Sequence, residues 1–332
     1  MPSPEYALMF SLDPWSFPKT RRPDPEQLDF DLDQSLNALL QLHVQVPPQA
    51  YTAPILGTTR TGHGVAIDTD GHILTIGYLV TEAEQVWCRK RDGTVVQADV
   101  LAYDQPSGFG LLKSFSRLDC GFIPLGKSSQ LAAGDPVYML GHGGIHQCLK
   151  TAVTAIKPFA GSWEYLLDLA IFIEPAHPEW SGSPLLDQDG KLVGIGSLLT
   201  QEIRQGQTQQ SNMVVPIDLL VPMLESLIRQ GHSGRAPRPW LGLYLEEHDQ
   251  QLMVQHTSPE GPADLAGVLS EDLVLSVAGQ RVQDLASFYR CVWALGQAGV
   301  VVPLQIARGA ELLSMNLRSI NRSDRLMKPL SH

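Results

Sequence analysis

The stretch "HPEWSGSPLLDQDGKLVG", residues 177–194, holds a serine between a tryptophan and a glycine, followed by a turn that leads into an apolar run. A serine hydroxyl becomes a nucleophile when a neighbouring base takes its proton and backbone donors receive the oxyanion that forms. Ser181 is therefore a candidate for acyl transfer. The residues that could supply the base and the oxyanion hole decide whether it reacts.

A second group with chemical potential lies in the loop "GHGGIHQC", where Cys148 follows His142 and His146. Imidazole and thiolate groups are common zinc ligands. The spacing here is loose, the loop is rich in glycine and no carboxylate is interleaved. We therefore predict no metal site and no cofactor.

The composition is that of an ordinary globular protein with two or three domains, since 43% of the 332 residues are hydrophobic and 18% are charged. The 35 acidic residues outnumber the 24 basic ones and give a net charge of -11, which argues against nucleic acid or an anionic membrane as the main partner. No stretch approaches the about 18 uninterrupted apolar residues of a membrane-spanning helix.

The N-terminus lacks the basic start, apolar run and cleavage site of a secretory signal. The four cysteines show no paired spacing, which is typical of reduced thiols. These features predict a cytoplasmic protein, or a periplasmic one if the chain lacks its leader.

Short apolar runs separated by turns predict a β-rich fold. Asp68–Gly71, Asp92–Gly93 and Asp189–Gly190 are hairpin turn signals, which favour a sandwich or barrel. A helix is predicted within residues 215–231, ending near Gly231. We expect an N-terminal arm at 1–30, a β-domain at 31–228, a linker at 229–239, a second module at 240–322 and a tail at 323–332.

The arm carries four aromatic residues, Tyr6, Phe10, Trp15 and Phe17. It is either an arm that lies along the surface of its own domain or one that docks on a neighbouring subunit.

Several motifs resemble, in order, the HtrA (high-temperature-requirement, Deg-like) family of trypsin-fold serine proteases. They are "LTIGYLV", "DQPSGFGLLK", "PLGKSSQLAAGDPVYMLG", "SGSPLLDQDGKLVGIG" and, after the linker, "SPEGPADLAGVLSEDLVLSVAGQRV". The resemblance runs from about residue 55 to 320. It implies a mainly β fold, with a trypsin-like double β-barrel followed by a PDZ domain, which is a small α+β barrel with helices.

The resemblance also assigns the positions of a catalytic triad. The family's general-base histidine corresponds to Tyr78, its orienting aspartate to Gly108 and its nucleophile to Ser181. A phenol, with a pKa of about 10, is protonated at neutral pH, and glycine has no side chain with which to orient a base. Two of the three triad roles have lost the residue type that performs them, so Ser181 is predicted to be retained but inactive.

The oxyanion hole departs from the family pattern too. The residue two before the serine, a glycine whose N–H is a donor in the family, is Glu179 here. A carboxylate there could sit where negative charge must develop. Trp180 replaces a small polar residue and either plugs the vacated cleft or offers an aromatic platform to a peptide.

A relocated base would restore chemistry. The resemblance brings four histidines near the cleft, namely His63, His72, His142 and His177. One of them within hydrogen-bond distance of Ser181 would form a dyad able to hydrolyse activated esters or small amides.

In the second module, "PWLGL" resembles the family's carboxylate-binding loop, and a predicted helix near 284–295 would border the peptide groove. The resemblance implies a peptide-binding set of Trp240, Leu241, Gly242, Leu243, Phe288 and Val292. The alternative is a module that packs on the β-domain and binds nothing.

Two functions follow from these residues. The first is a non-catalytic HtrA-like pseudoprotease that binds peptide C-termini or extended protein segments through its PDZ domain. The second is a serine endopeptidase or hydrolase that uses Ser181 with a relocated base. The family's trimers add a homo-oligomer, or a mixed assembly with an active family member, as expected partners.

Overall fold

The computed structural model describes residues 15–204 and 206–327, which form two compact units. The first unit contains the described residues up to Lys157 together with Leu169–Gly234. The second contains Pro158–Asp168 and Arg235–Met327. The division between Gly234 and Arg235 falls inside the segment "HSGRAPRP", which is rich in turn residues.

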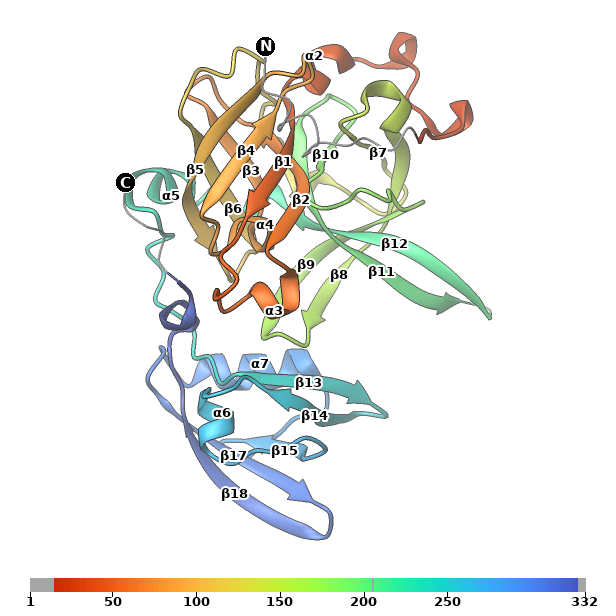
Figure 1. Cartoon of the computed structure of the whole chain (residues 1–332). Helices are drawn as coiled ribbons and strands as arrows, with labels where there is room; N and C mark the ends of the chain where they lie inside the picture. The colour runs from red at the N-terminus through yellow and green to blue at the C-terminus, as the bar shows by residue number, and fades with distance from the viewer. Residues whose placement is uncertain (1–14, 205, 328–332) are drawn as a thin grey trace. The chain divides into compact units, whose positions relative to one another are not determined.

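Six antiparallel strands close the first barrel in the order β1-β2-β3-β6-β5-β4 (Figure 1). Their bounds are β1 Leu39–Gln45, β2 Thr59–Ala66, β3 His72–Ile76, β4 Gln85–Arg89, β5 Val95–Asp104 and β6 Phe109–Ser114. Two predicted turns join neighbouring strands, with Gly71 (φ 86°) between β2 and β3 and Gly93 (φ 84°) between β4 and β5. Glycine meets the positive φ of these turns without a steric cost.

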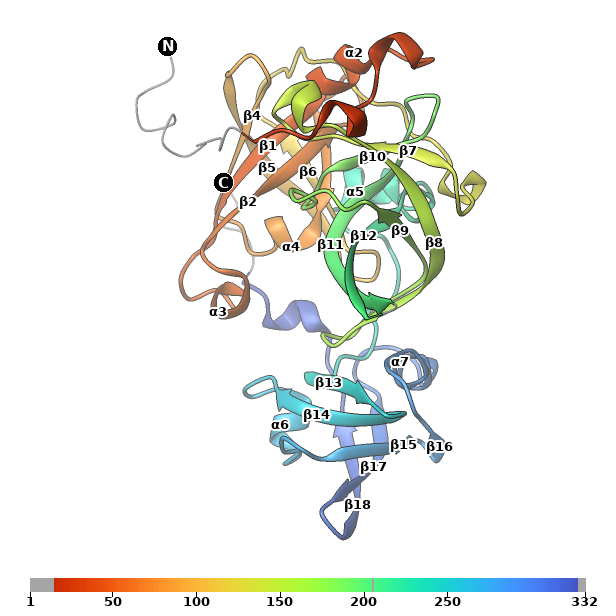
Figure 2. The ribbon, with the colours of Figure 1, turned by 90° about the vertical axis from the view of Figure 1, so that its right-hand side faces the viewer.

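A second closed barrel follows the order β10-β11-β12-β9-β8-β7, which Figure 2 shows from the side. Its strands are β7 Pro136–Met139, β8 Leu149–Gly161, β9 Tyr165–Glu174, β10 Pro184–Leu186, β11 Leu192–Arg204 and β12 Gln207–Pro216. Its interior is filled by a cluster of apolar side chains that includes Val137, Leu149 and Val214.

Helices are short in the first unit. The α-helices are α2 Leu32–Asn37, α3 Ala53–Leu56, α4 Gly77–Val80 and α5 Leu224–Gln230, and the 3-10 helices are Lys19–Arg21, Pro25–Gln27, Ser128–Gln130, Gly144–Gln147 and Ile217–Leu219. The helix predicted within 215–231 is confined to α5, which ends at Gly231 (φ 75°). Pro222 explains the shortening, because proline lacks an N–H and disfavours a helical conformation in the residue before it.

The second unit is a sheet in the order β13-β14-β15-β17-β18, with β16 paired to β15. Its elements are β13 Leu243–His248, β14 Gln251–Thr257, α6 Pro262–Leu265, β15 Leu273–Val277, β16 Gln280–Arg281, α7 Leu285–Ala294, β17 Val301–Arg308, β18 Glu311–Arg318 and a 3-10 helix Arg322–Arg325. The side chain of Asp284 caps α7 through a reciprocal pair of bonds with Ser287.

The apolar face of α7 packs into the core of this unit, and the tip of the β8–β9 hairpin adds Leu166 to the same cluster. The prediction of a mainly β chain, with a double barrel followed by a small α+β module, is confirmed. Among the described residues, no helix has the length and apolar character needed to cross a bilayer.

Candidate functional site

The two barrels bring Ser181 and Tyr78 into contact. Ser181 precedes β10, and Tyr78 lies in α4, directly after β3. The Tyr78 hydroxyl is hydrogen-bonded to Ser181 Oγ at 2.8 Å and to the carbonyl oxygen of Ser197 at 2.9 Å. Tyr78 is the donor in both bonds, so its single hydroxyl proton is shared between Ser181 Oγ and the Ser197 carbonyl.

The protonation of Tyr78 is fixed by its surroundings. Burial raises the pKa of Tyr78 to about 12, and its interactions with Ser181 and Trp180 offset only part of this rise. The phenol therefore stays neutral at physiological pH and keeps the proton that it directs at Ser181 and Ser197. It cannot take the proton of Ser181 in this state.

Gly108 lies beside Tyr78 through the backbone. The N–H of Gly77 donates to the Gly108 carbonyl at 2.7 Å, and Gly108 has a φ of 84°. The nearest aspartate along the chain, Asp104, is buried and accepts from the N–H and the hydroxyl of Ser107 at 3.0 and 2.6 Å. This carboxylate caps its own turn.

The Glu179 amide, which the resemblance assigns to the oxyanion hole, is also bonded within the protein. The N–H of Glu179 donates to His177 Nδ1 at 3.0 Å, and His177 Nε2 is 2.7 Å from the carbonyl oxygen of Gln147. These two bonds assign the proton of the neutral ring to Nε2. Burial lowers the pKa of His177 to about 4, so the ring stays neutral and keeps accepting the Glu179 amide.

The four histidines proposed as relocated bases have other partners. His63 Nδ1 is 3.1 Å from Ser183 Oγ, His72 Nδ1 is 2.6 Å from Asp68, His142 Nε2 is 3.1 Å from the carbonyl of Arg89, and His177 is bonded as described above. Burial, aided by neighbouring histidines, lowers the pKa of His63 to about 3. Within the described residues, the side-chain partner of Ser181 Oγ is Tyr78.

The loop that suggested a metal site is held by separate contacts. His146 Nδ1 is 2.8 Å from Arg22, and the Cys148 thiol donates to the carbonyl of Gly144 at 3.3 Å. Burial raises the pKa of Cys148 to about 12, which keeps it a thiol. These groups do not converge on a shared point.

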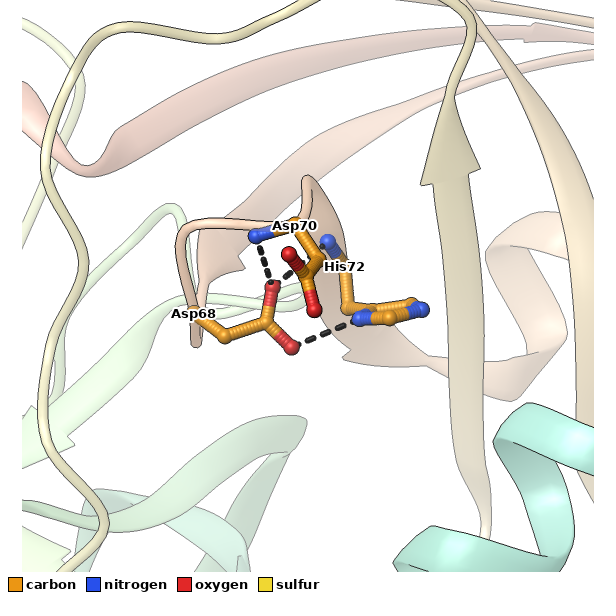
Figure 3. A group of neighbouring side chains, drawn as sticks. All are labelled: Asp68, Asp70 and His72. Carbon is orange, nitrogen blue, oxygen red and sulfur yellow. Dashed lines mark hydrogen bonds and ion pairs between the residues drawn. The ribbon is translucent and has the colours of Figure 1, made fainter.

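A different group gathers side chains that could ligate a metal, namely Asp68, Asp70 and His72 (Figure 3). Asp68 accepts from the N–H groups of Asp70 and His72 at 2.9 and 3.2 Å, as well as from the His72 ring. These bonds make it the cap of the β2–β3 turn, and they account for the closeness of the three side chains.

The described part of the N-terminal arm lies on the second barrel. Phe17 is buried in its core cluster, and the rings of Trp15 and Phe17 contact His177 edge to face at 5.6 and 5.2 Å. The indole N–H of Trp15 donates to the Glu179 carboxylate at 2.8 Å. These two aromatic residues dock on their own chain, which favours the first of the two arrangements expected for the arm. Tyr6 and Phe10 lie outside the described residues.

The loop expected to bind a carboxylate holds one. Glu164, at the tip of the β8–β9 hairpin, accepts through its carboxylate from the N–H groups of Leu241, Gly242 and Leu243 at 3.1, 2.7 and 3.1 Å. Its side chain is buried, and burial raises its pKa to about 7 against the opposing effects of the three N–H groups and Arg322.

The side chains of the predicted peptide-binding set are buried, and their role in binding stays a prediction. They are Trp240, Leu241, Leu243, Phe288 and Val292, with exposed fractions of 5, 0, 1, 0 and 1%. Sequence reasoning missed Glu164, which lies 77 residues before Leu241. The aromatic stretch "FAGSWEY" around it is a local signal for burial of this hairpin tip.

Comparison with known proteins gives two family matches. Residues 62–195 match the description "Trypsin-like peptidase domain" and residues 239–318 match "PDZ domain". The chain is 28% identical over 270 residues to a probable periplasmic serine endoprotease, DegP-like, of Pseudomonas fluorescens. It is 26% identical over 235 residues to a protein of the same description from Hahella chejuensis.

These alignments cover 77 and 67% of this chain and 55 and 49% of the relatives, so the chain spans about half the length of the curated relatives it matches. The predicted cytoplasmic location is wrong, because these relatives are named as periplasmic proteins.

Two solved structures share the fold. The HtrA-type protease AlgW with a decapeptide has a TM-score of 0.53 at 18% identity and covers 90% of this chain and 98% of its own. The serine endoprotease from Yersinia pestis has a TM-score of 0.51 at 20% identity, with 88 and 98% covered. The two matched domains in their order, the relatives and the shared fold establish that this chain belongs to the HtrA family of trypsin-fold proteins with a C-terminal PDZ domain.

Proposed function

We propose that this chain is a proteolytically silent HtrA-family protein that binds peptide C-termini or extended protein segments through its PDZ domain. The observation that carries the first half is the hydrogen bond between Tyr78 and Ser181, at the position where the family has its general base. Tyr78 donates its proton toward Ser181 and Ser197, whereas a general base must accept the serine proton, so the direction of the hydrogen bond is the reverse of what catalysis needs.

The rate lost without a general base supports a proteolytically silent Ser181. Removing the general base from a serine protease costs about 10⁶ in rate, and the activity that survives depends on the oxyanion hole. Here the N–H of Glu179 is bonded to His177, and the residue itself carries a carboxylate, which accepts from the Trp15 indole. A developing oxyanion would lack this N–H donor and would form beside a residue of like charge.

The second half of the proposal rests on the PDZ domain and on its loop. The backbone of Leu241, Gly242 and Leu243 presents three N–H groups to one carboxylate, which is the chemistry that captures a peptide C-terminus. The AlgW structures described with a tripeptide or a decapeptide show that family members of this fold take peptides. We propose the periplasm as the site of this binding, which the names of the relatives support.

The serine endopeptidase alternative is kept because the relatives are named as serine endoproteases. A fluorophosphonate probe separates the two functions, since it labels a serine only when a base activates it. We expect no covalent adduct on the wild-type chain by intact mass, under conditions in which an active trypsin-fold protease is labelled fully. An adduct on the wild type that is lost in Ser181→Ala would establish the alternative.

Assembly is a separate part of the proposal. A homotrimer, or a mixed oligomer with an active family member, would allow a silent subunit to act as a scaffold. Native mass spectrometry, alone and with an active family member, tests this, and a monomer under both conditions would end it.

A further inference from the structure

We propose that Glu164 is an internal ligand of the PDZ domain, so that a peptide C-terminus enters the carboxylate-binding loop only when the hairpin tip, residues 158–168, leaves it. This inference rests on the peptide-binding function proposed above. All the residues concerned belong to the second compact unit, to which the hairpin tip is assigned together with residues 235–327.

The loop is built for a carboxylate. Three consecutive backbone N–H groups, those of Leu241, Gly242 and Leu243, converge on Glu164 Oε1, and the Leu241 N–H is also 3.1 Å from Oε2. Gly242 has a φ of 72°, the left-handed conformation that turns successive N–H groups toward one point. A side-chain carboxylate offers the same pair of oxygens as a peptide C-terminus, so Glu164 satisfies the loop as an external ligand would.

The same hairpin tip also supplies an apolar anchor. Leu166 is 7% exposed and belongs to the buried cluster that contains Phe288 and Val292 of α7, two residues expected to line the peptide groove. A peptide ligand combines a carboxylate in the loop with an apolar side chain against the helix. Glu164 and Leu166 present this combination from one short segment.

Further contacts hold the tip in place without using the loop. The Tyr289 hydroxyl donates to the carbonyl of Gly161 at 2.6 Å and lies 3.2 Å from the N–H of Glu164. Asp168 also pairs with Arg290, but both side chains are exposed and this ion pair contributes little to holding the tip. These contacts keep Glu164 close to the carboxylate-binding loop at a high effective concentration. A free peptide must compete with Glu164 for the N–H groups of this loop.

The bound tip carries strain that its release would remove. Glu164 has a φ of 60°, a left-handed conformation that is unfavourable for a residue with a side chain. A conformation of this kind persists where the surrounding contacts require it. The tip is thus held by the loop, the Leu166 contacts and Tyr289 together, and a competing ligand that removes the loop contact weakens the whole set.

The test uses the full chain at pH 8 and a fluorescent decapeptide library with free C-terminal carboxylates and three randomised final residues, beside the same library as C-terminal amides. The variants are Glu164→Gln, which keeps the shape but not the charge, and Glu164→Ala, which empties the loop. Asp168→Asn is the matched control, because it removes a carboxylate from the same tip outside the loop.

We expect Glu164→Ala to bind the free-carboxylate library at least about tenfold more tightly than the wild type, with Glu164→Gln between them and Asp168→Asn within about twofold of the wild type. The amides should bind none of the proteins. Equal affinity of the wild type and Glu164→Ala would overturn the internal ligand and leave peptide binding intact. An absence of binding by every variant would overturn both proposals.

A second readout covers the case in which a variant fails to fold. Hydrogen exchange of the wild type, with and without saturating peptide, reports directly on residues 158–168. We expect exchange in this segment to rise when peptide is bound, while exchange in β13 falls. Unchanged or reduced exchange at the tip with peptide bound would contradict displacement.

Discussion

Ser181 should stabilise the fold of this chain, whereas the nucleophile of a working protease commonly does not. Active sites hold reactive groups in costly arrangements, so replacing a nucleophile by alanine is often neutral or stabilising. Here Ser181 Oγ accepts a hydrogen bond from Tyr78, which also donates to the Ser197 carbonyl. We predict that Ser181→Ala destabilises the first unit by about 1 kcal/mol, the usual net value of one hydrogen bond.

The same network sets a larger value for Tyr78→Phe. That change removes both hydrogen bonds and leaves the carbonyl of Ser197, a buried residue, without its donor. The expected loss is about 2 to 3 kcal/mol, since an unpaired buried acceptor adds its desolvation cost to the lost bond. The double variant should be less destabilised than the sum by about 1 kcal/mol, because the Ser181–Tyr78 bond is counted in both single changes.

The assay is a urea titration read by pulsed hydrogen exchange of peptides from β1–β7 and β10–β12, which reports on the first unit alone. Tyr103→Phe is the matched control, because the Tyr103 hydroxyl has no hydrogen-bond partner within the described residues, and it should change stability by less than about 0.5 kcal/mol. The reasoning is refuted if Ser181→Ala raises the stability and Tyr78→Phe behaves like Tyr103→Phe.

Three further predictions concern other contacts. The pKa of Glu164 is raised from 4.5 to about 7 in the folded state. The free energy of unfolding of the second unit should therefore be highest below pH 4.5 and fall by about 3 kcal/mol as the pH rises through 7. Hydrogen exchange should show this pH dependence in the wild type and not in Glu164→Gln. Gly182→Ala places a Cβ 2.0 Å from the His63 carbonyl oxygen of β2, at a φ of 75°. It should lower the free energy of unfolding, measured in urea, by about 3 kcal/mol or more. The control Gly93→Ala, whose Cβ meets open space, should lower it by about 1 kcal/mol. Trp15→Ala removes a half-buried ring and its hydrogen bond to Glu179, and should lower the stability of the first unit by about 2 kcal/mol. Trp15→Phe keeps an aromatic ring and should lower the stability by less. Equal losses for the two variants would contradict a packing role of the ring.

Features with a short sequence range were predictable. The aspartate–glycine pairs marked turns because glycine accepts the positive φ that they require, as at Gly93 and Gly190. The resemblance gave the residue types at the triad positions, and the structure brings Tyr78 and Ser181 together. Their chemical roles follow from elementary acid–base properties, which do not depend on the fold.

Features that depend on distant segments were not predictable. No local pattern pairs Glu164 with a loop 77 residues further on, and an aromatic hairpin tip reads equally well as an exposed one. The bond from the Glu179 amide to His177 is local, but it exists only because Gln147 and Asn212 hold the histidine from two other segments. Sequence reasoning considered His177 as a base and could not know that its acceptor nitrogen was already used.

On the proposed function, both sites of this protein are filled by its own groups, yet they differ in how a ligand could open them. Tyr78 lies in α4 directly after β3, and His177 lies between β9 and β10 and is fully buried, so freeing their partners requires repacking of the first unit. Glu164 lies in a hairpin turn with a left-handed φ, and its carboxylate occupies the backbone N–H groups of the carboxylate-binding loop. A peptide can replace it with an equivalent carboxylate, so the number of hydrogen bonds to the loop is the same before and after exchange. Ser181 and the Glu179 amide are therefore bonded to groups that no ligand can displace without repacking. The PDZ loop is occupied by an internal carboxylate that a peptide can displace, so only this loop can respond to the concentration of a ligand.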